Sequence, residues 1–112
     1  MIHVLKRKVS QDEVEDMLQE LGSYIKLAVD IRRDVLAGGG AMHADCEAAL
    51  LDAGSNQEDV WGADWIPDSG EVRFESLINI RPRQGNRSMT IEDANVRDKV
   101  EAIVRLVLGG SQ

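Results

Sequence analysis

A strict alternation of apolar and polar side chains over residues 24–32 limits the fold of this chain more than any other feature. The apolar side chains are Ile25, Leu27, Val29 and Ile31, and the polar ones between them include Lys26, Asp30 and Arg32. This period of two predicts a β-strand with one buried face. A tight turn at 33–34 leads into a second strand at 35–37, which three glycines end. Because strands joined by so short a turn run antiparallel, a largely antiparallel sheet is expected.

The first helix has a complete start signal in the sequence. Ser10 is the expected N-cap, and Glu13 completes a capping box with it. Gly22 supplies a C-terminal stop. The apolar stripe between these signals consists of Val14, Met17, Leu18 and Leu21. This spacing predicts an amphipathic helix.

Two further segments carry helical patterns. Residues 43–53 are rich in alanine and leucine and stop at Gly54, which predicts a second helix. The alternative is that this segment extends the preceding strand. Asp93 is the expected N-cap of a last helix, which Gly109-Gly110 closes. Its apolar stripe is Val96, Val100, Ile103, Val104 and Val107.

Three more strands complete the expected fold. Residues 2–7 form a short strand, and residues 59–66 and 72–80 form a hairpin around a turn at 67–70. The expected order is therefore β-α-β-β-α-β-β-α within a single domain, residues 1–112. The predicted class is α+β, with a two-layer packing of a largely antiparallel sheet against amphipathic helices.

Charge and cysteine content exclude several classes of function. A formal net charge of −7 at pH 7 argues against binding to nucleic acid or to anionic membranes, which requires a broad basic face. A single cysteine excludes an internal disulfide framework. The N-terminal residues lack the order of a signal peptide, and no apolar run approaches the length of a membrane span. We therefore expect a cytoplasmic protein.

The most informative polar segment is the arginine loop, residues 79–88, which contains no acidic residue. Arg81, Arg83 and Arg87 are its cations, and guanidinium groups bind carboxylate and phosphate through two parallel hydrogen bonds. The neutral side chains expected to join them are Gln84, Asn86 and Ser88. One interpretation is a site for the anionic group of a small ligand or an acidic partner. The other is that the arginines pair with nearby acids, such as Asp64, Glu71 and Glu75.

Residues 43–47 contain four side chains that suggest chemistry. His43 is the strongest candidate for a general acid or base. Cys46 is a weaker catalytic candidate, because a lone cysteine among alanine and leucine is more often a small core residue. His43, Asp45 and Glu47 would share a face only on a strand. On the favoured helix they diverge, so no metal site is expected.

Trp61 and Trp65 fall on one face of the predicted strand at 59–66. They can stack on a ligand beside the arginine loop, which makes Trp61 a candidate binding residue. The alternatives are that both fill the core between sheet and helix, or that they form a homodimer interface.

Three segments also resemble a known family. These are residues 43–51, 54–62 and 78–88, which read HADCEAALL, GSNQEDVWG and INIRPRQGNRS. They resemble a small bacterial and archaeal family catalogued only as a domain of unknown function, and the N-terminal strand–helix–strand and C-terminal helix fit it as well. The resemblance covers nearly the whole chain. It implies a cytoplasmic single-domain protein with no assigned activity, cofactor or catalytic residue.

Three functions remain open at this point. The first is a non-catalytic binding or regulatory module whose arginine loop recognises an anion. The second is a small enzyme in which the loop holds an anionic substrate and His43 is the general acid or base. The third is a structural subunit that forms a homodimer through its tryptophan face. None of the three requires a cofactor.

Overall fold

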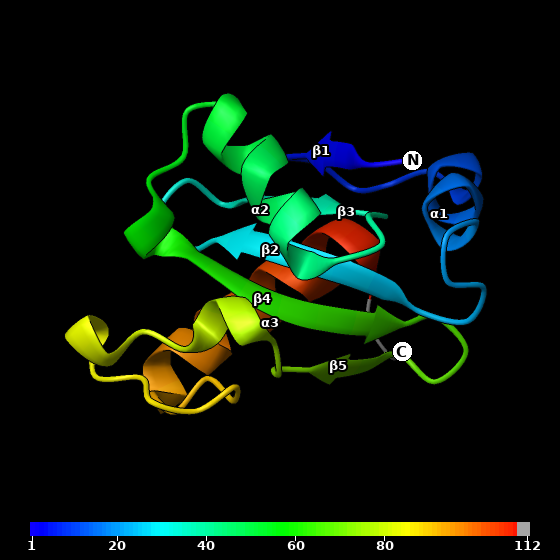
Figure 1. Ribbon diagram of the computed structural model, residues 1–112. Coiled ribbons are helices and arrows are strands. Elements are labelled where there is room, and N and C mark those ends of the chain that lie inside the picture. Colours follow the sequence, from blue (N-terminus) through cyan, green and yellow to red (C-terminus); the bar gives the residue numbers. More distant parts are fainter. Residues whose placement is uncertain (110–112) are drawn as a thin grey trace.

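The structure is a computed structural model that describes residues 1–109. Its five strands and three α-helices follow the predicted order (Figure 1). In chain order they are β1 (His3–Leu5), α1 (Gln11–Leu18), β2 (Ile25–Asp30), β3 (Val35–Gly38), α2 (His43–Asp52), β4 (Val60–Ile66), β5 (Glu71–Arg73) and α3 (Ala94–Leu108). Three single-turn 3₁₀ helices are η1 (Gln57–Asp59), η2 (Leu77–Asn79) and η3 (Pro82–Gln84). The helical prediction for residues 43–53 is thus confirmed.

All five strands form one sheet in the order β1-β3-β2-β4-β5, and each neighbouring pair is antiparallel. The tight turn between β2 and β3 therefore joins two antiparallel strands, as its short length requires. The longest pairing joins β2 to β4, and it places Lys26 opposite Asp64. Both of these side chains lie on the face of the sheet that α2 covers, near the first turn of that helix.

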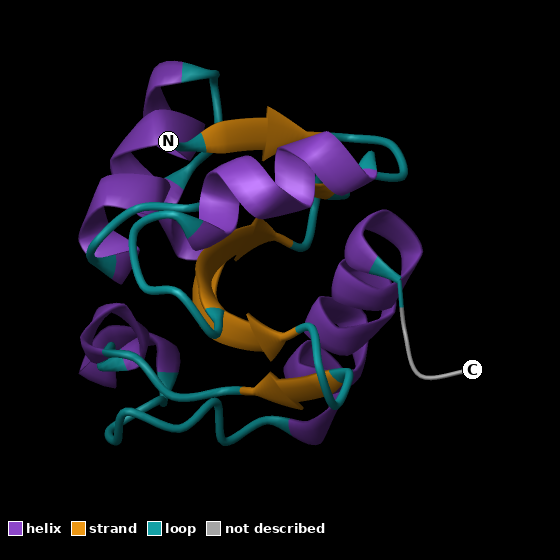
Figure 2. Ribbon diagram, turned by 90° about the vertical axis from the view of Figure 1, so that its right-hand side faces the viewer, coloured by secondary structure: helices purple, strands orange, loops and turns teal. Residues whose placement is uncertain are grey.

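Helices cover both faces of the sheet, so the packing has three layers where two were expected (Figure 2). α1 and α3 pack on the face that carries the alternating residues Leu27 and Val29. α2 packs on the opposite face, against Ala28 and its neighbours in β3 and β4. The alternation in β2 suggested one wet face, but Ala28 and Asp30 on that face are also fully buried. Alanine is small enough to let a helix approach closely, and this signal is easily missed in a sequence.

The two helix caps lie where the sequence predicts them. Ser10 Oγ accepts a hydrogen bond from the Glu13 N–H at 3.2 Å, and the Glu13 carboxylate accepts one from the Ser10 N–H at 2.9 Å. The Asp93 carboxylate accepts hydrogen bonds from the first turn of α3. Gly109 follows the last helical residue with a φ of 91°. Gly110, the second glycine expected to close this helix, lies outside the described residues.

Replacing Ser10 with alanine is expected to lower the free energy of unfolding by about 1 kcal/mol, because the first turn of α1 loses its side-chain cap. Chemical denaturation monitored by circular dichroism measures the change. A midpoint equal to that of the wild-type protein would contradict the role assigned to this cap.

The same capping box predicts a pH effect. Hydrogen bonds from the Arg7 side chain and the Ser10 backbone lower the pKa of Glu13 from 4.5 to about 2. Since the folded-state pKa is lower than the unfolded one, Glu13 contributes stability above pH 4.5, and this contribution is lost as the pH falls to about 2. Glu13→Gln is expected to flatten the fall in denaturation midpoint across that window. Parallel curves for the two proteins would show that Glu13 does not contribute.

The predicted strand at 72–80 is the largest local difference, because β5 ends at Arg73. The chain then turns through η2, and the side chain of Asn79 takes the place of a paired strand. Its amide oxygen accepts from the Gly62 N–H at 2.8 Å, and its amide nitrogen donates to the Gly62 carbonyl at 3.0 Å. The segment crosses β4 so closely that a Cβ on Gly62 would lie 2.5 Å from the Cβ of Ser76. A glycine is therefore required at position 62.

Candidate functional site

A groove of about 840 Å³ opens between α2, η1 and residues 77–84. Its polar lining includes the side chains of Asn56, Gln57 and Glu58 on one side and of Arg81, Arg83 and Gln84 on the other. Leu77, Ile78, Ile80 and Pro82 add an apolar wall. The arginine loop and a sizeable groove thus coincide, as expected if the loop contributes to a site.

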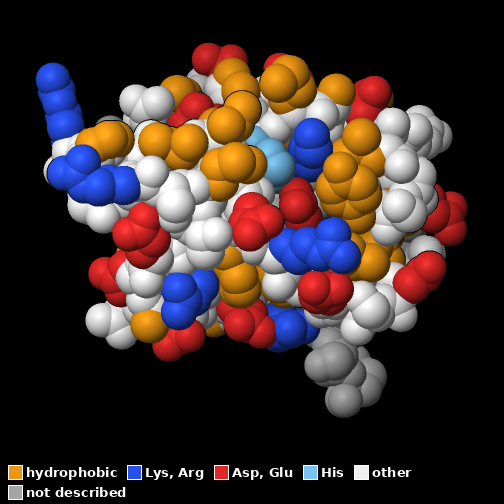
Figure 3. Space-filling model, turned by 60° about the horizontal axis from the view of Figure 1, so that its bottom comes forward, with side chains coloured by type: hydrophobic (Ala, Val, Ile, Leu, Met, Phe, Trp, Pro, Cys, Tyr) orange, Lys and Arg blue, Asp and Glu red, His pale blue; other side chains and the backbone are white. Residues whose placement is uncertain are grey.

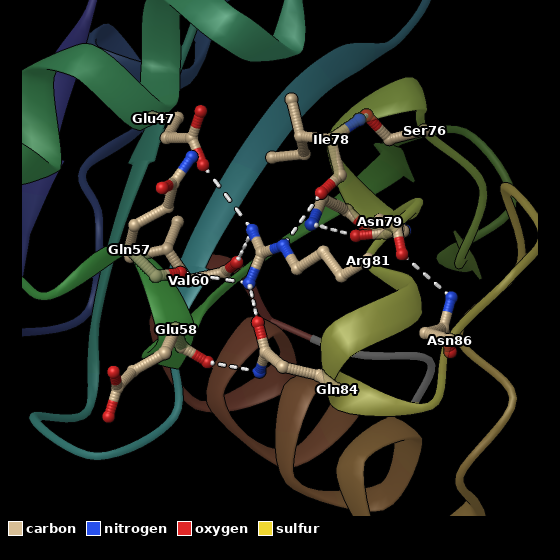
Figure 4. Close-up of polar contacts among 11 residues, drawn as sticks. Glu47, Gln57, Glu58, Val60, Ser76, Ile78, Asn79, Arg81, Gln84 and Asn86 are labelled. Carbon is tan, nitrogen blue, oxygen red and sulfur yellow. Dashed lines mark hydrogen bonds and ion pairs between the residues drawn. The ribbon is translucent and has the colours of Figure 1, made fainter.

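Arg81 is held inside the protein by acceptors on three different segments (Figure 4). Its Nε donates to the Ile78 carbonyl at 2.9 Å, and its two terminal nitrogens donate to the Gln57 carbonyl at 2.8 Å and to the Val60 carbonyl. The Gln84 side-chain oxygen lies 3.5 Å from the same guanidinium group. The remaining donor faces Glu47. All five guanidinium hydrogens are therefore directed at acceptors of this chain.

The charge of Arg81 is balanced by Glu47, an acid from α2 that the sequence analysis did not associate with the loop. Arg81 Nη2 lies 3.3 Å from Glu47 Oε2, and both side chains are nearly buried. Burial lowers the pKa of Arg81, and the Glu47 charge opposes that shift. The guanidinium carbon also lies 4.8 Å from the centre of the Trp61 ring, which adds a cation–π contact. Arg81 is thus a structural ion-pair partner at the floor of the groove.

Asn86 and Ser88 shape the loop from within. The buried Asn86 amide donates to three backbone carbonyls, those of Asn79, Ser88 and Thr90. Its oxygen accepts from the Glu92 N–H at 2.8 Å. Two of the three neutral side chains expected to contact a ligand, Asn86 and Ser88, thus have partners in the chain, since the Ser88 hydroxyl lies 2.9 Å from Glu92 Oε2.

Glu92 closes the loop. Its carboxylate accepts hydrogen bonds from the Ser88 hydroxyl and from the backbone N–H groups of Arg87 and Ser88. The Ser88 hydroxyl contributes most to lowering the pKa of Glu92, followed by the Arg87 N–H. The end of the loop is therefore held by its backbone, which leaves the Arg87 side chain outside this network.

Arg83 and Arg87 are both exposed, and within residues 1–109 neither forms a salt bridge. Arg83 lines the groove, whereas Arg87 does not. Gln84 lines it too, with its amide nitrogen donating to the Glu58 carbonyl at 3.0 Å. The three arginines of the loop therefore have three different environments: one structural, one at the groove and one away from it.

His43 lies in a second, smaller pocket of about 270 Å³. Its Nε2 is 2.8 Å from Asp64 Oδ1 and 3.1 Å from the Ala63 carbonyl. Because both partners are acceptors, Nε2 carries the hydrogen and Nδ1 is the acceptor of the neutral ring. Nδ1 makes no hydrogen bond with any residue that the structure describes. The contact fastens the first turn of α2 to β4 and also resembles the orientation of a catalytic histidine by a carboxylate.

The pocket at His43 borders the groove, since Leu77 and Ile78 line both. His43 is also one helical turn before Glu47, the partner of Arg81. The histidine and the arginine loop therefore belong to one region of the surface, although the sequence separates them by nearly forty residues.

Cys46 lies in the core that α2 forms with the sheet. Cys46 is fully buried, burial raises the pKa of its thiol, and its sulfur contacts the Lys26 carbonyl. A protonated, inaccessible thiol is a poor nucleophile. Among residues 1–109 no three His, Cys, Asp or Glu side chains come together as a metal site.

The tryptophans fill the core. Trp61 is 5% exposed and Trp65 7% exposed, and both pack with α3 and its neighbours. Their indole N–H groups have no acceptor in the structure. The core interpretation holds, and a dimer interface built on these two side chains is wrong because their faces are already covered. Trp61 meets the site only through the guanidinium group of Arg81.

Several residues of this region carry signals that a sequence shows only weakly. Asn79 stands at a polar position of the predicted strand at 72–80, Asp64 on β4 binds His43 on α2, and Glu47 is 34 residues from Arg81. The alternation places Asn79 on the outward-facing side of the predicted strand, so nothing in the local sequence indicates its complete burial. No helix within the described part of the chain is long and apolar enough to cross a membrane.

Comparison with known proteins identifies the family of this chain. No curated protein and no solved structure matches the chain. Residues 3–107 match the family described as "Protein of unknown function (DUF5674)", which confirms the resemblance seen in the sequence motifs. Because the match covers nearly the whole chain, this protein belongs to the DUF5674 family.

Proposed function

We propose that this protein is a non-catalytic binding module whose groove beside the arginine loop takes a ligand with one anionic group. The observation that carries the proposal is the placement of Arg83, an exposed guanidinium group without an ion-pair partner in residues 1–109, on the wall of the groove. Phosphate and carboxylate are the groups that a guanidinium fork binds best.

Two further features support this assignment. The side chains of Asn56 and Gln57 line the groove, and within the described residues neither makes a hydrogen bond. They can donate to a ligand oxygen near Arg83. Glu58 lines the groove as well, which disfavours a ligand with many negative charges. A discrete anion fits this balance better than a polyanion.

Phosphate or sulfate is expected to raise the melting temperature in a saturable way, because a ligand that binds only the folded protein stabilises it. Chloride at equal ionic strength should do much less, which separates binding from general screening. Arg83→Ala should remove most of the stabilisation by phosphate. Arg87→Ala is the matched control, since it removes the same charge from an exposed position outside the groove, and it should keep the effect.

The result that would contradict the proposal is a wild-type protein that does not respond to phosphate, or two variants that respond equally. In the first case the groove binds no anion. In the second, the effect comes from net charge and not from a site.

A second candidate function is acid–base catalysis by His43, and the contact with Asp64 favours it. A carboxylate that holds one ring nitrogen leaves the other free to accept a proton or attack a carbonyl. The test is hydrolysis of p-nitrophenyl acetate, in which the imidazole attacks the ester carbonyl and p-nitrophenolate leaves. His43→Gln should abolish the rate above buffer. His3→Gln is the control, because His3 also contacts a carboxylate, Asp16, at 2.6 Å. Equal rates of ester hydrolysis for the two variants would exclude a catalytic role of His43.

A further inference from the structure

Exposed apolar side chains border both the groove and the pocket at His43. These are Met42, Leu77, Ile80 and Met89. They are half of the eight large hydrophobic side chains that are exposed within residues 1–109, so the exposed hydrophobics are concentrated in this region. Figure 3 shows a face on which hydrophobic side chains lie together beside a histidine, with basic and acidic side chains around them. A concentration of this kind marks a binding surface.

The two hollows adjoin each other. Leu77 and Ile78 form a wall common to both. β4 runs beneath them, with Arg81 bound to the carbonyl of Val60 at one end and His43 bound to Asp64 near the other. These two strand residues are four positions apart, a distance of about 13 Å along β4.

We infer that this surface binds an extended peptide segment of a partner protein, an inference that rests on the proposed function because Arg83 belongs to the same site. An extended chain also advances about 13 Å in four residues. Because its side chains alternate between two sides, residues four positions apart point to the same side. Two such side chains can therefore reach the two hollows. Apolar side chains of the peptide occupy the two hollows. An acidic residue of the peptide, next to the second apolar residue, contacts Arg83. The amides of Asn56 and Gln57 meet the peptide backbone.

The lining of the two hollows favours a peptide over a lipid surface. Glu58 lines the groove and Glu75 lines the pocket, and both oppose an anionic membrane. The carboxamide groups of Asn56 and Gln57 are exposed to water, and once an occupant covers them they need other hydrogen-bonding partners, which a peptide backbone supplies and an acyl chain does not.

Two synthetic hexapeptides of equal composition, blocked at both ends, test the inference by isothermal titration calorimetry. The first has leucine at positions one and five, aspartate at position six, and serine or threonine between. The second has both leucines at positions one and two. We expect the first to bind at least ten-fold more tightly, because only its leucines have the spacing of the two hollows.

A matched pair of protein variants locates the binding. Leu77 is 67% exposed on the common wall, and Leu106 is 70% exposed on α3. Leu77→Ser should weaken binding of the first peptide about ten-fold, and Leu106→Ser should leave it unchanged. In the wild-type protein, the first peptide should bind more tightly than the same peptide with asparagine at position six. Arg83→Ala should reduce this difference in affinity.

Several results would overturn the inference. If neither peptide binds at millimolar concentration but phosphate still protects through Arg83, the inference fails and the proposed function stands. If phosphate protection is absent too, both fail. Self-association of the wild-type protein that Leu77→Ser abolishes would identify the occupant as a second copy of the chain. Binding to phosphatidylcholine vesicles that Leu77→Ser abolishes would identify a lipid surface. Equal effects of Leu77→Ser and Leu106→Ser would show that the surface is not the site.

Discussion

Replacing Arg81 with alanine is expected to lower the free energy of unfolding by about 3–5 kcal/mol, because it leaves Glu47 as a buried carboxylate without its partner. The same change removes the donors to the Ile78, Gln57 and Val60 carbonyls. Urea denaturation followed by tryptophan fluorescence measures the loss. Arg83→Ala, which removes an exposed arginine two residues away, should change stability by no more than about 0.5 kcal/mol.

Two further variants separate charge from geometry at this position. Arg81→Lys keeps the charge but offers three donors from one nitrogen, so it should recover only a minor part of the loss. Combining Arg81→Met with Glu47→Gln removes both charges, and the double variant should be more stable than the sum of the single changes predicts. Equal stabilities for Arg81→Ala and Arg83→Ala would refute the structural role of Arg81.

Replacing Asn79 with alanine is expected to cost a similar amount, about 3–5 kcal/mol, since a buried group left without its hydrogen bond costs about 1–3 kcal/mol. The Asn79 side chain serves the N–H and carbonyl of Gly62 and the carbonyls of Phe74 and Met89. Hydrogen exchange of the Gly62 amide should accelerate strongly in the variant.

Asn95→Ala is the control for Asn79, because Asn95 is an exposed asparagine on α3. Its stability should stay within about 0.5 kcal/mol of the wild-type value. Asn79→Asp tests the direction of the hydrogen bonds, since it keeps the acceptor for the Gly62 N–H and turns an oxygen toward three carbonyls. It should be as destabilised as the alanine variant at pH 7. A stable Asn79→Asp protein would contradict the hydrogen bonding described for this residue.

Local sequence signals predicted most of the elements, because their causes are local. The capping box of Ser10 and Glu13, the cap at Asp93 and the alternation in β2 each arise within a few residues, and the two caps and the strand are observed. The third layer was missed because the burial of Ala28 and Asp30 depends on α2, which joins the sheet only in the folded protein. The alternation from Val72 onward predicted a strand up to residue 80, but β5 ends at Arg73, and the reason is similar. The Asn79 side chain hydrogen-bonds to Gly62, a residue 17 positions away in the sequence.

The same distinction holds for the site. The hydrogen-bond donors that are dense in residues 79–88 include three that line the groove, Arg81, Arg83 and Gln84. Which arginine faces inward depends on distant acceptors, since Arg81 binds Gln57, Val60 and Glu47. No pattern within the loop distinguishes it from Arg83. The pairing of His43 with Asp64 likewise arises from the contact of α2 with β4, which periodicity does not reveal.

The most direct measurement of the proposed anion site is an NMR titration of the ¹⁵N-labelled protein with inorganic phosphate. We expect saturable shifts at the side-chain Nε–H of Arg83, at the side-chain amide of Gln57 and at backbone amides of residues 56–58 and 82–85. The Nε–H of Arg87 and the amides around His43 should stay in place. Shifts centred on Arg87 or on His43, or shifts that rise linearly with phosphate everywhere, would contradict an anion site at the groove.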